Sequence, residues 1–269
     1  MKTYKQVFNE LKSKNEGALV AFTVIGDPDY ETSLDIIKKI IDSGANILEL
    51  GLPFSDPIAD GPTIQAADIR ALSKGMNTDK AFDFIKQIRE YNGKIPIGLL
   101  VYANLIFQRG IDRFYYDAAK VGITSVLIAD VPVEEADEYI AAARKHEVDT
   151  VFIISPLTSN NRIKKITEKT RGFVYVVSRL GVTGARSSLE ESTLKLVKRI
   201  KTFTDTPLCV GFGISRPEHV KSIVKAGADG VIVGSAIIDL IAKNINNREK
   251  MLNDIGAYIK TMKDATRVL

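Results

Sequence analysis

Residues 45–62 read ANILELGLPFSDPIADGP. The first seven of them form a short apolar run bounded by turn formers, which is typical of an interior strand of a parallel sheet. Glu49 then lies near the C-terminal end of that strand, and Asp60 lies in the loop that follows. A carboxylate with apolar flanks is costly to bury unless a partner or a substrate compensates for its desolvation. Glu49 is therefore a candidate functional residue, and Asp60 is a second one.

Simpler explanations exist for each acidic residue of this stretch. Glu49 could pair with a neighbouring Lys or Arg, and the aspartates could only shape turns, because Asp-Pro is a common turn starter. For Asp56 the turn-forming role and a functional role explain the sequence equally well.

The same strand pattern recurs along the whole chain, with an amphipathic segment after each apolar run. The apolar runs begin near Ala18, Ile47, Ile97, Ser125, Thr150, Phe173, Leu208 and Gly230. Helices are predicted, among others, over Thr32–Ser43, Asp79–Tyr91, Arg113–Val121, Glu134–His146, Asn160–Thr170, Leu189–Thr202 and Pro217–Ala226.

Eight such units in 269 residues predict a single α/β domain over residues 1–269, a (β/α)8 TIM barrel with extended loops after strands 2 and 6. A doubly wound open sheet is the alternative. The first strand-to-helix turn, residues 24–29, lacks the G-x-G-x-x-G pattern, so a nicotinamide or flavin cofactor is not expected.

Composition is that of an ordinary globular protein, with 45 % hydrophobic and 26 % charged residues. The net charge of +4 comes from interspersed basic and acidic residues, so nucleic-acid binding is not expected. The amino-terminal segment lacks a signal-peptide core and no apolar stretch could span a bilayer, so we expect a cytoplasmic protein that is not attached to a membrane. The lone Cys209 fits core packing in a reducing compartment, and no Cys/His cluster has metal-ligand spacing.

Glycines follow the last two predicted strands and indicate a phosphate site. Residues 211–215 read GFGIS, and residues 234–236 read GSA. Without a Cβ, a glycine lets its N–H approach an anion, and a helix that starts at Ser235 adds unpaired N–H groups. The loops after strands seven and eight hold phosphate in this architecture. Gly184, in the stretch GVTGAR at residues 181–186, is either a third contact or a hinge.

Together, ELGLPFSDPIADGP, GVTGAR, VGFGIS and VGSAI resemble the tryptophan synthase alpha subunit, in the family's order and along nearly the whole chain. The resemblance implies a carbon–carbon lyase of tryptophan biosynthesis that cleaves indole-3-glycerol phosphate to indole and glyceraldehyde 3-phosphate. It implies no cofactor in this chain. It also implies a partner, a beta subunit that carries pyridoxal phosphate, in an alpha2beta2 complex.

Residue by residue, Glu49 matches the family's catalytic acid/base and Asp60 its second catalytic carboxylate. A group that both donates and accepts protons works best with a pKa near ambient pH, and a strand-end carboxyl in an apolar pocket is placed to have its pKa raised. Asp60 must stay ionised to stabilise positive charge on the indole ring. Asp56 is expected at the partner interface.

The remaining site residues follow from the same resemblance. The indole pocket is expected to be lined by Phe22, Ile64, Leu100, Tyr102, Leu127, Tyr175 and Phe212, and the phosphate to be bound by Gly184, Gly213, Gly234 and Ser235. Thr183, also expected among the substrate-binding residues, is expected to close the sixth loop against the loop of Asp60 and so to exclude water. For most of the apolar residues plain core packing explains the sequence equally well.

Two other functions remain open at this point. One is a free-standing barrel enzyme that acts on a different phosphate ester, and the other is a weakly catalytic subunit that activates a partner. One departure from the family is visible, because the chain has Ala103, Asn104 and Leu105 where the family often has Tyr-Asn-Pro. We expect the loss of the proline to loosen the third loop.

Overall fold

The computed structural model describes residues 1–177, 186–211 and 213–267. For residues 186–190 it describes the backbone only. In this part of the chain nine parallel strands form one sheet in the order β5-β4-β3-β2-β1-β9-β8-β7-β6. The strands are β1 (Ala18–Val24), β2 (Ile47–Gly51), β3 (Ile97–Val101), β4 (Ser125–Ile128), β5 (Asp149–Thr150), β6 (Phe152–Ile154), β7 (Val174–Val177), β8 (Leu208–Gly211) and β9 (Gly230–Val233). All eight predicted strand starts are confirmed to within one residue.

The two edge strands of this sheet, β5 and β6, belong to one segment that is interrupted only at Val151. The N–H of Val151 donates to the carbonyl of Val126 on β4 at 3.2 Å. The carbonyl of Thr150 accepts from the N–H of Arg171, just before β7, at 3.0 Å. One segment therefore joins both edges, so the sheet closes into the predicted eight-position barrel, and the open doubly wound alternative is wrong.

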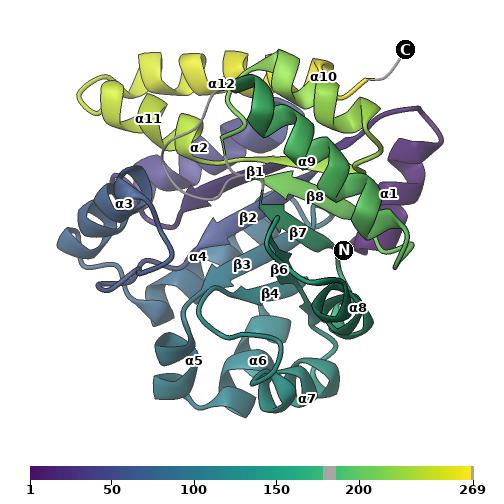
Figure 1. Ribbon diagram of the computed structural model, residues 1–269. Coiled ribbons are helices and arrows are strands. Elements are labelled where there is room, and N and C mark those ends of the chain that lie inside the picture. Colours follow the sequence, from purple (N-terminus) through teal and green to yellow (C-terminus); the bar gives the residue numbers. More distant parts are fainter. Residues whose placement is uncertain (178–185, 212, 268–269) are drawn as a thin grey trace.

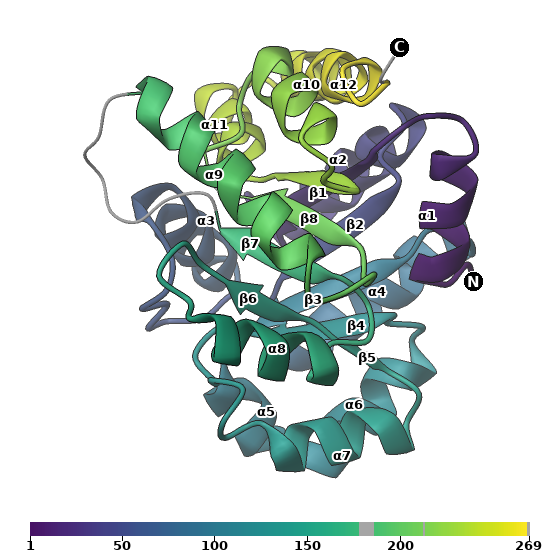
Figure 2. The ribbon, with the colours of Figure 1, turned by 45° about the vertical axis from the view of Figure 1, so that its right-hand side comes forward.

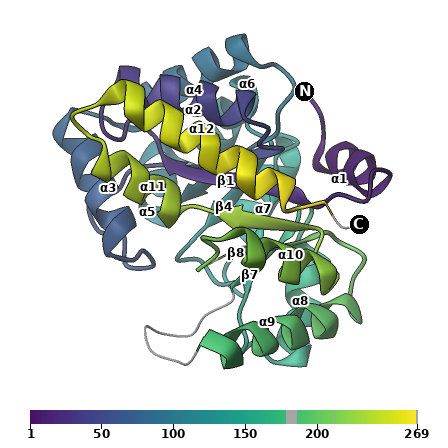
Figure 3. The same cartoon turned by 90° about the horizontal axis from the view of Figure 1, so that it is seen from above.

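Helices surround this barrel (Figure 1). They are α1 (Tyr4–Lys12), α2 (Tyr30–Asp42), α3 (Pro62–Ser73), α4 (Thr78–Tyr91), α5 (Ala103–Arg109), α6 (Ile111–Lys120), α7 (Asp137–Lys145), α8 (Asn160–Lys169), α9 (Arg186–Lys201), α10 (Pro217–Lys225), α11 (Ser235–Lys243) and α12 (Arg248–Asp264). Figure 3 shows α12 crossing over β1 beside α11. In the described residues, none of these helices has the length and apolar character needed to cross a membrane.

Helix α1 closes the barrel at the N-terminal ends of the strands. Thr3 begins it with a capping box, in which its hydroxyl accepts from the N–H of Gln6. Tyr4 is 2 % exposed, and its hydroxyl lies 2.7 Å from that of Ser125, the first residue of β4. The same hydroxyl fills the space beside Gly98, where a Cβ would lie 3.1 Å from it. In Figure 2, α1 and α3 lie on opposite sides of the barrel, so the end that is open to ligand is the one near α3.

A buried ion pair fastens α3 to the loop that follows β1. The side chain of Asp27 is fully buried, and it accepts two hydrogen bonds from Arg70, at 2.6 and 2.9 Å. Such a bidentate pair is strong only while both partners are present, because either charge alone is poorly solvated in the interior.

Removing one partner of this pair should therefore be strongly destabilising. We expect Arg70→Met to lower the free energy of unfolding by about 3–5 kcal/mol in urea denaturation at neutral pH. The double variant Asp27→Asn/Arg70→Met should recover part of the loss, because no buried charge is then left unpaired. A loss below about 1 kcal/mol in the single variant, the range of a surface pair, would contradict a buried ion pair.

Candidate active site

A cavity of about 260 Å³ opens at the C-terminal ends of the barrel strands. It is lined by Phe22, Asp60, Gly61, Pro62, Thr63, Ile64, Leu100, Tyr175, Gly213, Ile214, Ile232, Gly234 and Ser235. Eight of the predicted site residues are in that lining, although they come from segments up to 213 positions apart, from Phe22 to Ser235. Among the residues that the structure describes, the lining contains neither Lys nor Arg.

Glu49 lies in the middle of β2, in register with Phe22 of β1 and Gly98 of β3. It is 3 % exposed, and its Oε2 has no hydrogen-bond partner among the residues that the structure describes. Burial, and then the negative charge of Asp60, raises the pKa of Glu49 to about 8. At neutral pH the carboxyl group is mainly protonated, so it can act as an acid, and its conjugate base can take a proton back.

Asp60 lies in the loop between β2 and α3 and is held by Tyr102. The Tyr102 hydroxyl donates to Asp60 Oδ2 at 2.7 Å and accepts from the N–H of Ala59 at 3.1 Å. Phe54 stacks on the Tyr102 ring with the centroids 5.2 Å apart. Burial raises the pKa of Asp60, whereas the hydrogen bond from Tyr102 lowers it. The net effect on Asp60 is a raised pKa, and its negative charge in turn opposes ionisation of Glu49.

Two of the glycines that were predicted to bind phosphate, Gly213 and Gly234, lie at the cavity wall near β8 and β9. Gly213 has φ +75°, a backbone conformation that side chains with a Cβ rarely adopt. Gly234 is the N-cap residue of α11, and a Cβ there would lie 2.9 Å from Phe22 Cδ1. Ser235 begins α11, so its N–H lies at the positive end of the helix dipole, and the first N–H groups of the helix that donate to a helical carbonyl are those of Ile237 and Ile238, both to Gly234.

Other predicted residues lie outside this lining. Tyr102 and Leu127 are each 2 % exposed, and Tyr102 contacts Asp60 through the hydrogen bond described above. Asp56 is exposed in the loop after β2. Thr183, Gly184 and Phe212 fall outside the described residues. The third loop folds as α5, and the N–H of its first residue, Ala103, donates to Asp130 at 2.8 Å.

The start of α3 contributes residues that the sequence analysis missed. Gly61, Pro62 and Thr63 line the cavity, because α3 begins at Pro62 directly after the Asp60 loop. A proline that follows a glycine is a usual first residue of a helix, and this signal could have predicted α3. The buried Asp68 on the same helix was missed as well.

The fold and the cavity define a class of protein, namely a (β/α)8 barrel with a largely apolar cavity at the C-terminal ends of its strands, where Asp60 and glycines line the wall and the buried carboxyl group of Glu49 lies on a neighbouring strand. A family model for the tryptophan synthase alpha chain matches residues 8–267. The chain belongs to the tryptophan synthase alpha chain family, whose members are lyases of tryptophan biosynthesis.

Individual relatives match over nearly the full length. The alpha chain of Methanothermobacter thermautotrophicus is 54 % identical over 248 residues, which are 92 % of each chain. The alpha chain of Escherichia coli O1:K1 is 47 % identical over 267 residues, 99 % of this chain and 100 % of that one. The crystal structure of the alpha subunit from Legionella pneumophila str. Paris superposes with a TM-score of 0.90 at 32 % identity and covers 99 % of this chain and 98 % of that one.

Proposed function

We propose that this chain cleaves indole-3-glycerol phosphate to indole and glyceraldehyde 3-phosphate by a retro-aldol reaction. The observation that carries the proposal is Glu49, a buried carboxyl whose Oε2 has no partner among the described residues and which is protonated at neutral pH near an apolar cavity. A buried carboxyl oxygen without a partner is unfavourable for stability, and a carboxyl group in this environment is suited to proton transfer.

The chemistry follows from the positions of the two carboxyl groups. Glu49 gives its proton to the ring carbon that bears the glycerol phosphate side chain, which places positive charge on the ring nitrogen. Ionised Asp60 accepts the ring N–H and stabilises that charge. A proton then leaves the hydroxyl group next to the ring, the bond between the ring carbon and the side chain breaks, and its electron pair returns to the ring. Indole and the aldehyde are the products, and Glu49 can recover the hydroxyl proton.

The rest of the cavity serves to bind the substrate in this proposal. Apolar side chains such as Phe22, Ile64 and Leu100 face the indole ring, and the N–H groups near Gly213 and Gly234 bind the phosphate. This chain needs no cofactor of its own for the reaction. Thr183, Gly184 and Phe212 keep their expected roles in closing the sixth loop, binding the phosphate and lining the indole pocket.

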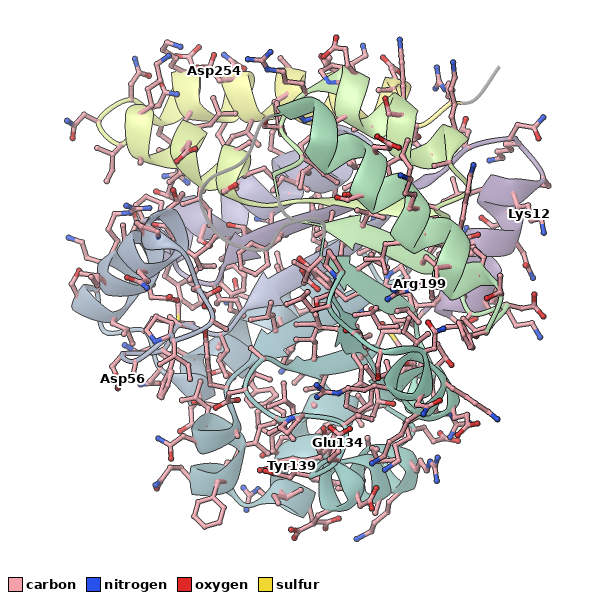
Figure 4. The ribbon with its side chains drawn as sticks, in the orientation of Figure 1. Lys12, Asp56, Glu134, Tyr139, Arg199 and Asp254 are labelled. Carbon is pink, nitrogen blue, oxygen red and sulfur yellow. The ribbon has the colours of Figure 1, made fainter. Side chains whose placement is uncertain are left out.

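A beta chain that carries pyridoxal phosphate is the proposed partner, in an alpha2beta2 complex. Three apolar side chains near the open end of the barrel are unusually exposed: Ile58 at 84 %, Phe107 at 68 % and Leu157 at 77 %. Exposed apolar residues of this size indicate a protein contact when they share a surface. Asp56, at the periphery of the molecule in Figure 4, lies two residues before Ile58 and would border the same contact.

The first experiment measures indole release from indole-3-glycerol phosphate by the purified chain, alone and with a cognate beta chain. We expect turnover that increases when the beta chain is added. Absence of indole in both reactions, with the fold intact by circular dichroism, would overturn the proposed substrate. Equal turnover in both would support the substrate and overturn the activating partner.

The phosphate site is tested by replacing Gly213 with Val. A β-branched residue at φ +75° is strained by about 1–3 kcal/mol, and its side chain keeps the N–H away from the anion, so KM should rise at least about tenfold. Gly227 is a matched control, since its φ is +101° and nothing lies within 4 Å of an added Cβ. Gly227→Val should lower stability and leave KM unchanged. An unchanged KM in Gly213→Val would place the phosphate elsewhere.

A further inference from the structure

Asp68 is a buried acidic side chain that the proposed reaction does not use. It lies on α3 four positions after Ile64, so the two residues share one face of the helix, and Ile64 lines the cavity. Asp68 is 4 % exposed, and its Oδ2 has no hydrogen-bond partner among the described residues. An unpartnered carboxylate oxygen in the interior is unfavourable, so its presence requires an explanation.

The surroundings of Asp68 connect it to Asp60. The backbone N–H of Phe54 hydrogen-bonds to the Asp68 carboxyl group, and the Phe54 ring stacks on Tyr102. Tyr102 in turn holds Asp60 Oδ2 at 2.7 Å. A continuous series of contacts therefore runs from the Asp68 carboxyl group through Phe54 and Tyr102 to Asp60, a proposed catalytic carboxylate.

The charged groups around Asp68 are mostly negative. Among the described residues, those that act on it are Asp60 from the loop after β2 and Asp27 from the loop after β1. Arg70 is already bound to Asp27 through two hydrogen bonds. The charge of Asp68 also contributes to raising the pKa of the Tyr102 hydroxyl, which lies at the end of β3. Burial, followed by the charge of Asp60, raises the pKa of Asp68 to about 7, and the Phe54 N–H offsets part of the rise.

We propose that Asp68 is a positioning residue of the active site: it holds the loop that carries Asp60 and, when ionised, adds a second negative charge behind that carboxylate. The second charge makes the potential at the ring nitrogen more negative, so it stabilises the cation that forms when the ring carbon is protonated. The effect on rate rests on the proposed function, whereas the coupling of the two carboxyl groups does not.

The coupling is tested first without substrate, by following the carboxyl carbons of the aspartates by NMR as pH is raised. We expect one resonance to titrate near pH 7 in the wild type and to be absent in Asp68→Asn. The Asp60 resonance, assigned with Asp60→Asn, should show a second shift over the same pH range in the wild type only. Absence of either signal would overturn the proposal, whether or not the chain releases indole. Asp239→Asn, which alters an exposed aspartate of α11, should keep both signals.

The rate effect is tested with kcat for indole release at pH 6 and pH 8. Asparagine can still accept the Phe54 N–H, so Asp68→Asn should match the wild type at about pH 6 and be slower by about tenfold near pH 8, the effect of one nearby charge. Asp68→Ala loses the loop contact too and should be slow at both pH values. Equal losses in Asp68→Asn at both pH values would show a merely structural role and overturn the proposal. Lack of turnover in the wild type would instead refute the proposed reaction, and the NMR result would still decide the coupling.

Discussion

Replacing Glu49 with Gln is expected to lower kcat for indole release by about 10² to 10⁴, the usual contribution of a general acid or base. The amide has the size of the carboxyl group, but it has no acidic proton to give to the ring and cannot recover one. KM should change little, because Glu49 is not part of the phosphate or apolar lining. Steady-state kinetics of indole release measures both constants. A variant with near-normal kcat would show that Glu49 is not the acid.

The pH dependence of the wild type checks the same assignment. The pKa of Glu49 is raised to about 8, so the proton-donating form is lost and kcat should fall as pH rises through about 8. The folded state binds this proton more tightly than the unfolded chain, so the stability linked to it is present at low pH and is lost between the unfolded pKa and about 8. Glu49→Gln should therefore be at least as stable as the wild type at neutral pH. Glu249→Gln, on the exposed first turn of α12, is the matched control and should keep full activity.

Replacing Asp60 with Asn is expected to lower kcat by about 10² to 10³, the range for loss of one preorganised electrostatic contact. The asparagine oxygen can still accept the Tyr102 hydroxyl, so the loop stays in place and only the negative charge is lost. The measurement is kcat for indole release, with the fold checked by circular dichroism.

The variant Tyr102→Phe distinguishes the contribution of the Asp60 charge from that of the Asp60 position. It keeps the Asp60 charge but removes its hydrogen bond, and it leaves the Ala59 N–H without its partner. We expect a smaller loss of kcat than in Asp60→Asn. If Tyr102→Phe were the slower variant, position and not charge would be the main contribution of Asp60.

The strands were predictable because a closed parallel barrel buries both faces of each strand. All seven residues of β1 are buried, so the sequence shows a continuous apolar run with clear ends. The interruption of the fifth strand at Val151 was not predictable, because it depends on pairing with β4 and β7, which are far away in the sequence.

Helices α1, α3, α5 and α12 were not among the helices named from the sequence, and α1 and α3 were missed for different reasons. Helix α1 carried a readable capping box, with Thr3 three residues before Gln6. Helix α3 has only three buried residues, Ala67, Asp68 and Ala71, so its apolar stripe is too weak to stand out. Its first residues, Pro62, Thr63 and Ile64, nevertheless line the cavity.

Glu49 and Asp60 were proposed as a catalytic pair from a carboxylate in an apolar run and from the family resemblance, whereas the contacts that hold Asp60 in place were not predicted. The contacts among Asp60, Tyr102 and Phe54 join the ends of two strands, and no local pattern reports them. The same holds for Asp68, whose burial against Phe54 depends on how α3 packs.

The closed N-terminal end of the barrel has a consequence for isotope exchange. Tyr4 fills the space beside Gly98, the residue in register with Glu49, and its hydroxyl is bound to Ser125. Tyr4 and Ser125 therefore fill the space on the N-terminal side of Glu49, and in the proposed complex a ligand in the cavity would cover its other side. In the proposed reaction, a proton that Glu49 takes up during one catalytic cycle is therefore expected to stay on it until product leaves. The hydrogen delivered to the next substrate is set by solvent contact between cycles, when the barrel is empty.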